Sequence, residues 1–170
     1  VLVSQEHMRD GRAQVIVADI NSVTGEETAE QARSAGGKAV SLHTDVTEPD
    51  SIQAAIRTTV EKFGKLDVLY NNAGGANAAD TSVIDVPLDE FWRAIKLDLF
   101  GTFLGCRFGI PEMIKTGGGS IINVVSIVAL KGFLPSPSYA SAKGGIAALT
   151  RSLAVAYAPH KVRVNAIAPC

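Results

Sequence analysis

The feature that most constrains this chain is a regular alternation of short apolar runs with longer segments of helical spacing. The run Gln14–Asp19 is continuous, apolar and closed by an acid, which is typical of a strand buried on both faces. Four further runs of this kind follow, at Lys38–Leu42, Leu66–Tyr70, Ser120–Val125 and Lys161–Ile167. Strands separated by helices form βαβ units. The sequence therefore predicts an α/β fold, a doubly wound parallel sheet with helices on both faces.

Helices are predicted between these strands. The first is capped by Asn21 or Ser22 and ends at Gly36-Gly37. The second has a capping-box-like start at Thr47-Glu-Pro-Asp50. A long helix has one apolar face and runs to Pro111, and a last helix begins at about Ser138. The apolar face of the long helix is formed by Leu88, Trp92, Ile95, Leu99, Phe103, Cys106 and Ile110.

Composition limits the classes of function. With 170 residues, 46% hydrophobic and 19% charged, the chain is expected to form a single domain over residues 1–170. The net charge of −1 gives no basic surface for nucleic acid or an anionic membrane. No apolar run approaches the ~20 residues that span a bilayer, and no signal peptide is visible, so we expect a soluble, cytoplasmic protein. Cys106 and Cys170 fit neither a metal site nor a disulfide framework.

Three side chains are candidates for proton transfer. Tyr139 and Lys143 stand at i and i+4 of a predicted helix, so a phenol and an ammonium share one face. A phenol has a pKa near 10 and becomes useful at neutral pH when a cation stabilises the phenolate. Ser126, at the end of a strand, offers a hydroxyl to a substrate oxygen. A Tyr and Lys four residues apart are, taken alone, usually ordinary surface and packing residues.

Several motifs together carry more weight than this pair. They are Asp45-Val46, Asn71-Asn-Ala-Gly74, Ser126, Tyr139-x-x-x-Lys143 and Val162-Arg-Val-Asn-Ala-Ile-Ala-Pro169. In this order and at these spacings they resemble the short-chain dehydrogenase/reductase family, from about Gly11 to the last residue. The resemblance implies a Rossmann-like fold and hydride transfer between a nicotinamide cofactor and a small-molecule alcohol or ketone.

The resemblance also implies roles for individual residues. Tyr139 is expected to be the general acid/base, Lys143 to lower its pKa and hold the nicotinamide ribose, and Ser126 to orient the substrate oxygen. The cofactor-binding residues implied are Asp19, Ile20, Asp45, Val46, Asn72, Ala73, Gly74, Tyr139 and Lys143, with Asn71 beside them. The carboxylate of Asp19 would accept the adenosine ribose hydroxyls and repel a 2′-phosphate, which favours NAD over NADP. Asp19 could also simply cap the next turn, and Asn71–Gly75 could be an ordinary glycine turn.

The chain departs from the family pattern at Asp98, where the family has asparagine. Asparagine there holds a water that links to the lysine, whereas aspartate only accepts hydrogen bonds and is charged. Asp98 is thus a candidate fourth catalytic residue, either paired directly with Lys143 or serving the same water.

A second departure is the missing glycine-rich turn that would cradle the cofactor's pyrophosphate. Val1–Ser4 resembles the family's first strand, but residues 5–13 are too few for both a phosphate loop and a crossover helix. We therefore expect an incomplete first βα unit, a chain truncated at both ends relative to the family, and weakened NAD binding.

Two other functions remain open at this stage. The chain could be a non-catalytic remnant that binds a partner or co-assembles with complete subunits. In the family the two long helices commonly form a dimer interface, which implies a homodimer or homotetramer here. A nucleoside- or sugar-modifying relative of the extended type is the third possibility. Phe133, Leu134 and Trp92 would add apolar surface to a substrate pocket or would serve in packing.

Overall fold

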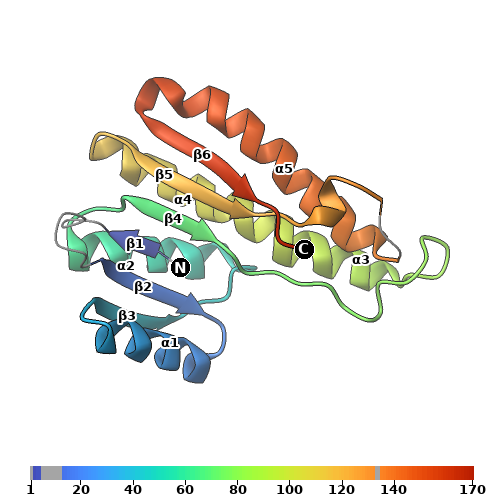
Figure 1. Cartoon of the computed structure of the whole chain (residues 1–170), viewed down its shortest axis with the longest axis horizontal. Helices are drawn as coiled ribbons and strands as arrows, with labels where there is room; N and C mark the ends of the chain where they lie inside the picture. The colour runs from blue at the N-terminus through green and yellow to red at the C-terminus, as the bar shows by residue number, and fades with distance from the viewer. Residues whose placement is uncertain (1, 5–12, 133–134) are drawn as a thin grey trace.

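The computed structural model describes residues 2–4, 13–132 and 135–170. They form a six-stranded sheet in the order β3-β2-β1-β4-β5-β6 (Figure 1). The strands are β1 (Leu2–Ser4), β2 (Gln14–Asp19), β3 (Lys38–His43), β4 (Val68–Asn71), β5 (Gly119–Val124) and β6 (Val162–Ile167). The helices are α1 (Ser22–Ser34), α2 (Pro49–Phe63), α3 (Leu88–Ala94), η2 (Ile95–Phe100), α4 (Gly101–Lys115), η3 (Ile127–Ala129), α5 (Pro137–Tyr157) and η4 (Ala158–His160). This is the predicted α/β architecture.

Helices pack on both faces of the sheet. On one face Ala29 of α1 is buried against Val17 of β2 and Ala39 of β3. On the other face α2 and α4 enclose the larger core. That core contains Ile16, Ile52, Ala55, Ile56, Leu66, Leu69, Leu104, Cys106, Ile110, Met113, Ile121, Val162 and Val164. The long helices α4 and α5 cover the half of the sheet that carries β4, β5 and β6, whereas α2 lies against β1 and β2.

The prediction of a wholly parallel sheet is wrong for one strand. β2 and β3 are parallel, as are β4, β5 and β6, but β1 runs antiparallel to both of its neighbours. Residues 5–13 explain the reversal, because a parallel connection needs a dozen or more residues. Ser4 consequently pairs with Gln14, at the amino end of β2.

The long helix differs from its prediction in two ways. It does not stop at Pro111, which lies inside α4, but continues to Lys115. The last turn is held in place because Met113 is fully buried in the core. Its middle turn, η2, is a π-helix that carries Asp98 into the interior. Such wide turns often occur at functional sites.

The two predicted helix caps have different outcomes. The side chain of Asn21 accepts hydrogen bonds from the N–H groups of Val23 and Thr24, so the predicted cap of α1 is confirmed. The capping box predicted at Thr47 is wrong. The hydroxyl and backbone N–H of Thr47 both donate to the carboxylate of Asp45, and Glu48 at the N-cap of α2 makes no side-chain capping bond.

Candidate active site

A cavity of about 500 Å³ lies at the carboxyl ends of β2 and β4. Seven of the nine predicted cofactor-binding residues line it: Asp19, Ile20, Asp45, Val46, Asn72, Ala73 and Gly74. Tyr139 and Lys143 are not among its lining residues. The structure thus separates the predicted set into a cavity group and a helix group.

The two carboxylates of the cavity are oriented by short local hydrogen bonds. Asp19 accepts a hydrogen bond from the backbone N–H of Asn21 at 2.8 Å, so it does cap the turn that leads into α1. Asp45 accepts from the hydroxyl of Thr47 at 2.7 Å and from its N–H at 2.8 Å. These bonds from Thr47 lower the pKa of Asp45 below its usual value. Asp45 therefore contributes a negative charge to the cavity at neutral pH.

Asn71 lines the cavity, but its side-chain amide is hydrogen-bonded to Asn123 of the neighbouring strand β5. The amide nitrogen of Asn71 donates to the side-chain oxygen of Asn123 at 2.9 Å, and Asn123 donates to Thr150 of α5 at 2.9 Å. A Cβ at Gly105 of α4 would collide with the Asn71 amide. The side chain of Asn71 therefore holds β4, β5 and α5 in place at this edge of the sheet.

The helix group is centred on Tyr139, in the first turn of α5. Burial is the main cause that raises the pKa of the Tyr139 phenol, and the Asp98 carboxylate raises it further. Hydrogen bonding with the Ser126 hydroxyl opposes this increase in the pKa. Ser126 follows β5 and caps η3 by accepting from the N–H of Val128 at 3.5 Å. Ser126 thus lies just after the end of β5, and Tyr139 lies in the first turn of α5.

Lys143 lies one turn further along α5, in a closed environment. Its ammonium is 3.0 Å from Oδ1 of Asp98, and the side chains are only 3% and 0% exposed. The same ammonium donates to the carbonyl of Val124 at 2.9 Å and lies 5.5 Å from the centroid of the Tyr139 ring. Of the two arrangements considered for Asp98, direct pairing with Lys143 is the one present.

This pairing changes the electrostatics expected around Tyr139. We predicted that Lys143 lowers the pKa of the phenol, but the pKa of Tyr139 is raised. Burial is the main reason, and the Asp98 carboxylate that pairs with the ammonium adds to it, because its charge disfavours a phenolate. Burial also raises the pKa of Asp98, although Lys143 counteracts this. Oδ2 of Asp98 has no hydrogen-bond partner within the described residues.

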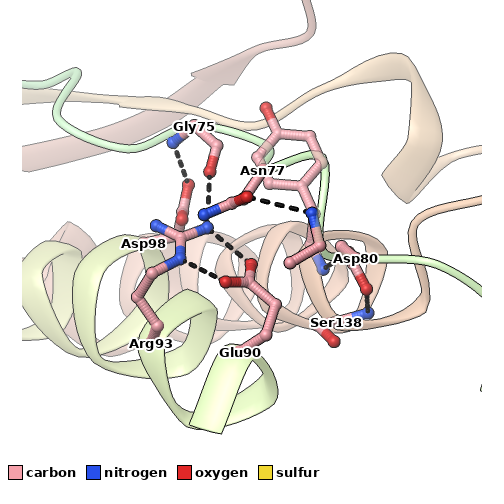
Figure 2. A network of polar contacts seen from close by, with 9 residues as sticks. Gly75, Asn77, Asp80, Glu90, Arg93, Asp98 and Ser138 are labelled. Carbon is pink, nitrogen blue, oxygen red and sulfur yellow. Dashed lines mark hydrogen bonds and ion pairs between the residues drawn. The ribbon is translucent and has the colours of Figure 1, made fainter. Parts of the chain in front are cut away.

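Sequence reasoning missed a polar network on the loop between β4 and α3 (Figure 2). Gly75 donates its N–H to Asp98 at 3.2 Å and accepts from the Arg93 guanidinium at 3.2 Å. Arg93 is itself held by both carboxylate oxygens of Glu90. Further along the loop, Asp80 accepts hydrogen bonds from α5. A Glu-x-x-Arg spacing was the visible signal for the Glu90–Arg93 pair, whereas Asp80 has no local signal.

Of the apolar residues suggested for a substrate pocket, only Trp92 lies within the described residues. Trp92 is 64% exposed on α3 and does not line the cavity, and Phe133 and Leu134 lie outside the described residues. Within the described ranges, no group of three or more His, Cys, Asp or Glu side chains is arranged to hold a metal ion. None of the helices in that part of the chain has the length and apolar character needed to cross a membrane.

Comparison with known proteins agrees with the fold and with the motifs. A solved structure of NAD⁺-bound xylitol dehydrogenase superimposes with a TM-score of 0.89 at 34% identity, covering 92% of this chain and 60% of that one. A 7α-hydroxysteroid dehydrogenase in complex with NADH and 7-oxo glycochenodeoxycholic acid gives a TM-score of 0.85 at 34% identity, over 92% of this chain and 60% of that one.

Sequence relatives point the same way. Trans-4-hydroxycyclohexanecarboxylate dehydrogenase of Sinomonas cyclohexanicum is 42% identical over 163 residues, which cover 92% of this chain and 62% of the relative. The chain therefore spans about three fifths of the length of the relatives it matches. The sequence profile of the short chain dehydrogenases matches residues 2–170. The chain belongs to the short-chain dehydrogenase family, whose members named here are oxidoreductases.

Proposed function

We propose that this chain carries the site of an NAD-dependent oxidoreductase that interconverts a secondary alcohol and a ketone. The observation that carries the proposal is the half-buried phenol of Tyr139, whose ring centroid lies 5.5 Å from the ammonium of the buried Lys143–Asp98 pair. Proton donors and acceptors gathered in this way suit a reaction in which a substrate oxygen gains or loses a proton.

The cavity at the carboxyl ends of β2 and β4 is suited to the nucleoside part of a nicotinamide cofactor. Its volume of about 500 Å³ lies within the usual range for ligand sites. Asp19 and Ile20 would meet the adenosine ribose, Asp45 and Val46 the adenine, and Asn72–Gly74 would line the path toward α5. Carboxylates at this end disfavour the 2′-phosphate of NADP. When bound, the nicotinamide would supply the two-electron hydride chemistry.

The protein's own residues would manage the proton. In the reducing direction the Tyr139 hydroxyl would donate its proton to the substrate oxygen, and in the oxidising direction the phenolate would remove it. Ser126 would hold that oxygen by a hydrogen bond. The raised pKa of Tyr139 keeps the phenol protonated at neutral pH, which is the form needed to reduce a ketone. Lys143 would reach the ribose hydroxyls, and Asp98 would fix the position of the lysine.

The substrate class follows from the relatives. Those named above act, by name, on a hydroxylated cyclohexanecarboxylate, a hydroxysteroid and xylitol. We therefore propose a small molecule with a secondary hydroxyl group as the substrate of this chain.

Two measurements on the 170-residue chain test the proposal. NADH fluorescence titration measures cofactor binding, and we expect the dissociation constant to be well above the low-micromolar range because the sequence shows no glycine-rich turn. Turnover is then measured with NAD and a panel of cyclic and acyclic secondary alcohols, at cofactor concentrations set by that titration. Absence of turnover with every alcohol and ketone at saturating NAD(H) would refute the oxidoreductase function.

A second candidate function is assembly with other subunits. Large apolar side chains are exposed along α3, η2 and α4: Leu88 (76%), Trp92 (64%), Phe100 (36%) and Phe103 (41%). The rings of Phe100 and Phe103 are stacked on this surface. A homodimer or homotetramer formed through the long helices would cover them. Light scattering after size-exclusion chromatography, with and without NAD, measures the mass, and a cofactor-independent oligomer without turnover would favour this function.

A further inference from the structure

The first turn of α5 is held by a residue that lies far away in the sequence. Oδ1 of Asp80 accepts the backbone N–H of Ser138 at 3.1 Å, and Oδ2 accepts the N–H of Tyr139 at 2.9 Å. The residues are 58 and 59 positions apart. Figure 2 shows the Asp80 carboxylate lying beside Ser138 at the start of the helix. One carboxylate therefore satisfies two of the N–H groups that every helix leaves free at its amino end.

The helix has no local substitute for this cap. The N-cap residue, Ser136, makes no side-chain capping bond, because its hydroxyl donates to the carbonyl of Pro135. The next residue, Pro137, has no N–H group. Water has little access, since Asp80 is 3% and Ser138 1% exposed. Loss of the Asp80 carboxylate would leave two buried donors without acceptors.

Asp80 is in turn fixed to the rest of the fold. The side chain of Asn77 accepts the N–H of Ala79, and its carbonyl accepts the N–H of Asp80, which together form a tight turn. Five residues before Asp80, Gly75 is held by Asp98 on one side and Arg93 on the other (Figure 2). The loop from Gly75 to Asp80 thus bridges the long helix and α5.

We infer that Asp80 is a positioning residue for Tyr139: it holds the first turn of α5 so that the phenol stays at the site it shares with Ser126. The inference rests on the catalytic role proposed above for Tyr139. Lys143 does not depend on this cap, because Asp98 and Val124 hold its ammonium. Removing the cap should therefore displace Tyr139 and leave Lys143 where it is.

The test compares Asp80→Ala and Asp80→Asn with Asp85→Ala. Asparagine keeps one acceptor and is a good capping residue. Asp85 is an exposed carboxylate of the same loop whose described hydrogen bonds are made with Ser82, so its removal controls for loss of a loop charge. Hydrogen exchange of the Ser138 and Tyr139 amides is measured by NMR. The phenols are titrated by ¹³C NMR with labelled tyrosine, and Tyr139→Phe assigns the Tyr139 signal.

In Asp80→Ala we expect the two amides to exchange about tenfold faster. The pKa of Tyr139 should fall toward its ordinary value, because burial is the main cause of its increase and the frayed turn is more exposed. Turnover should drop about tenfold through kcat, with little change in the KM for NAD. Asp80→Asn should lie between Asp80→Ala and the unmodified chain, and Asp85→Ala should match the unmodified chain.

Unchanged exchange and an unchanged Tyr139 titration in Asp80→Ala would overturn the inference. Equally fast amide exchange in Asp80→Asn and Asp80→Ala would also overturn it, because the acceptor that asparagine retains would then not protect the amides. If Asp80→Ala does not fold, Asp80→Asn decides by the same amide and phenol signals. Neither signal requires turnover, so the inference is decided even if the chain proves to have no oxidoreductase activity.

Discussion

Helices α1 and α5 both begin next to the candidate site, but their first turns are held in opposite ways. The cap of α1 is Asn21, an exposed neighbour only two and three residues from its donors. The cap of α5 is Asp80, a buried carboxylate from a different loop. A local cap stabilises its own helix, whereas a distant one also fixes the loop that supplies it. The stability of the first turn of α5, which carries Tyr139, should therefore be more sensitive to substitution than that of the first turn of α1, which follows Asp19.

The largest effect should come from the phenol itself. Tyr139→Phe keeps the ring and removes the proton-transfer group, so kcat should fall by about 10²- to 10⁴-fold while the free energy of unfolding changes little. Steady-state kinetics and urea unfolding measure the two quantities. Tyr157→Phe, at the far end of the same helix, is the matched control and should keep full activity. Retention of most activity in Tyr139→Phe would place the chemistry elsewhere.

A smaller but clear effect is expected where the loop meets Asp98. Gly74 has φ of 150°, and a Cβ there would run into the Asp98 carboxylate, so Gly74→Ala should lower the free energy of unfolding by about 2–3 kcal/mol. Gly75→Ala meets no atom within 4 Å and should lie within about 0.5 kcal/mol of the unmodified chain. Thermal unfolding of the pair measures the difference. Equal stability of the two variants would mean that the loop is less tightly held than we describe.

Asp98→Asn should change the pH dependence of the reaction. The Asp98 carboxylate raises the pKa of Tyr139, so its removal should lower that pKa. Alcohol oxidation needs the phenolate, and its rate rises with pH through the phenol's pKa, so the rising limb of the pH–rate profile should move to lower pH. The measurement is kcat/KM for oxidation from pH 6 to 10. A shift to higher pH would contradict this expectation, because it would mean that Asp98 lowers the pKa of the phenol by holding Lys143 in place.

The same variant should also alter how stability depends on pH. The pKa of Asp98 is raised in the folded state, so the folded protein holds this proton more tightly than the unfolded chain does. Its stabilising contribution is complete below the unfolded pKa and is lost as pH rises through the folded pKa. Asp98→Asn has no titrating group at this position, so this decrease in the free energy of unfolding should be absent. Urea unfolding at pH values below the unfolded pKa and above the folded pKa of Asp98 would detect the difference.

The smallest effect is predicted for the local cap. Asn21→Ala should lower the free energy of unfolding by about 1 kcal/mol, and Ser22→Ala, the adjacent control, by less. Urea unfolding of both variants beside Asp80→Ala compares the two caps directly. If Asn21→Ala destabilises the chain as much as Asp80→Ala does, the contrast between the two helices fails.

Local features of the fold were predictable from sequence. The strand runs and the cap at Asn21 depend on neighbouring residues, and the structure contains them. Of the residues predicted to form one apolar face of the long helix, Cys106 and Ile110 are buried, whereas Leu88, Trp92 and Phe103 are exposed. The cavity residues from Asp19 to Gly74 were anticipated from the resemblance to the family, and they line a cavity at the carboxyl ends of parallel strands.

The features that were missed depend on distant contacts. The helix passes Pro111 because Met113 beyond it is buried in the core. The direct pairing of Asp98 with Lys143 was one of two options that sequence left open, and burial of both groups was needed to decide it. Asp80 was missed because its partners are 58 and 59 residues away, and a single acid in a polar loop gives no signal of that.

The direction of β1 has a consequence for any attempt to rebuild the family's complete nucleotide site in this chain. Splicing a longer segment between Ser4 and Gln14 would not be a local graft. The strand would have to turn end for end and exchange its hydrogen-bonded partners on both β2 and β4. Such a redesign would require the middle of the sheet to form in a different arrangement. The inserted helix would also have to pack against a face of that sheet.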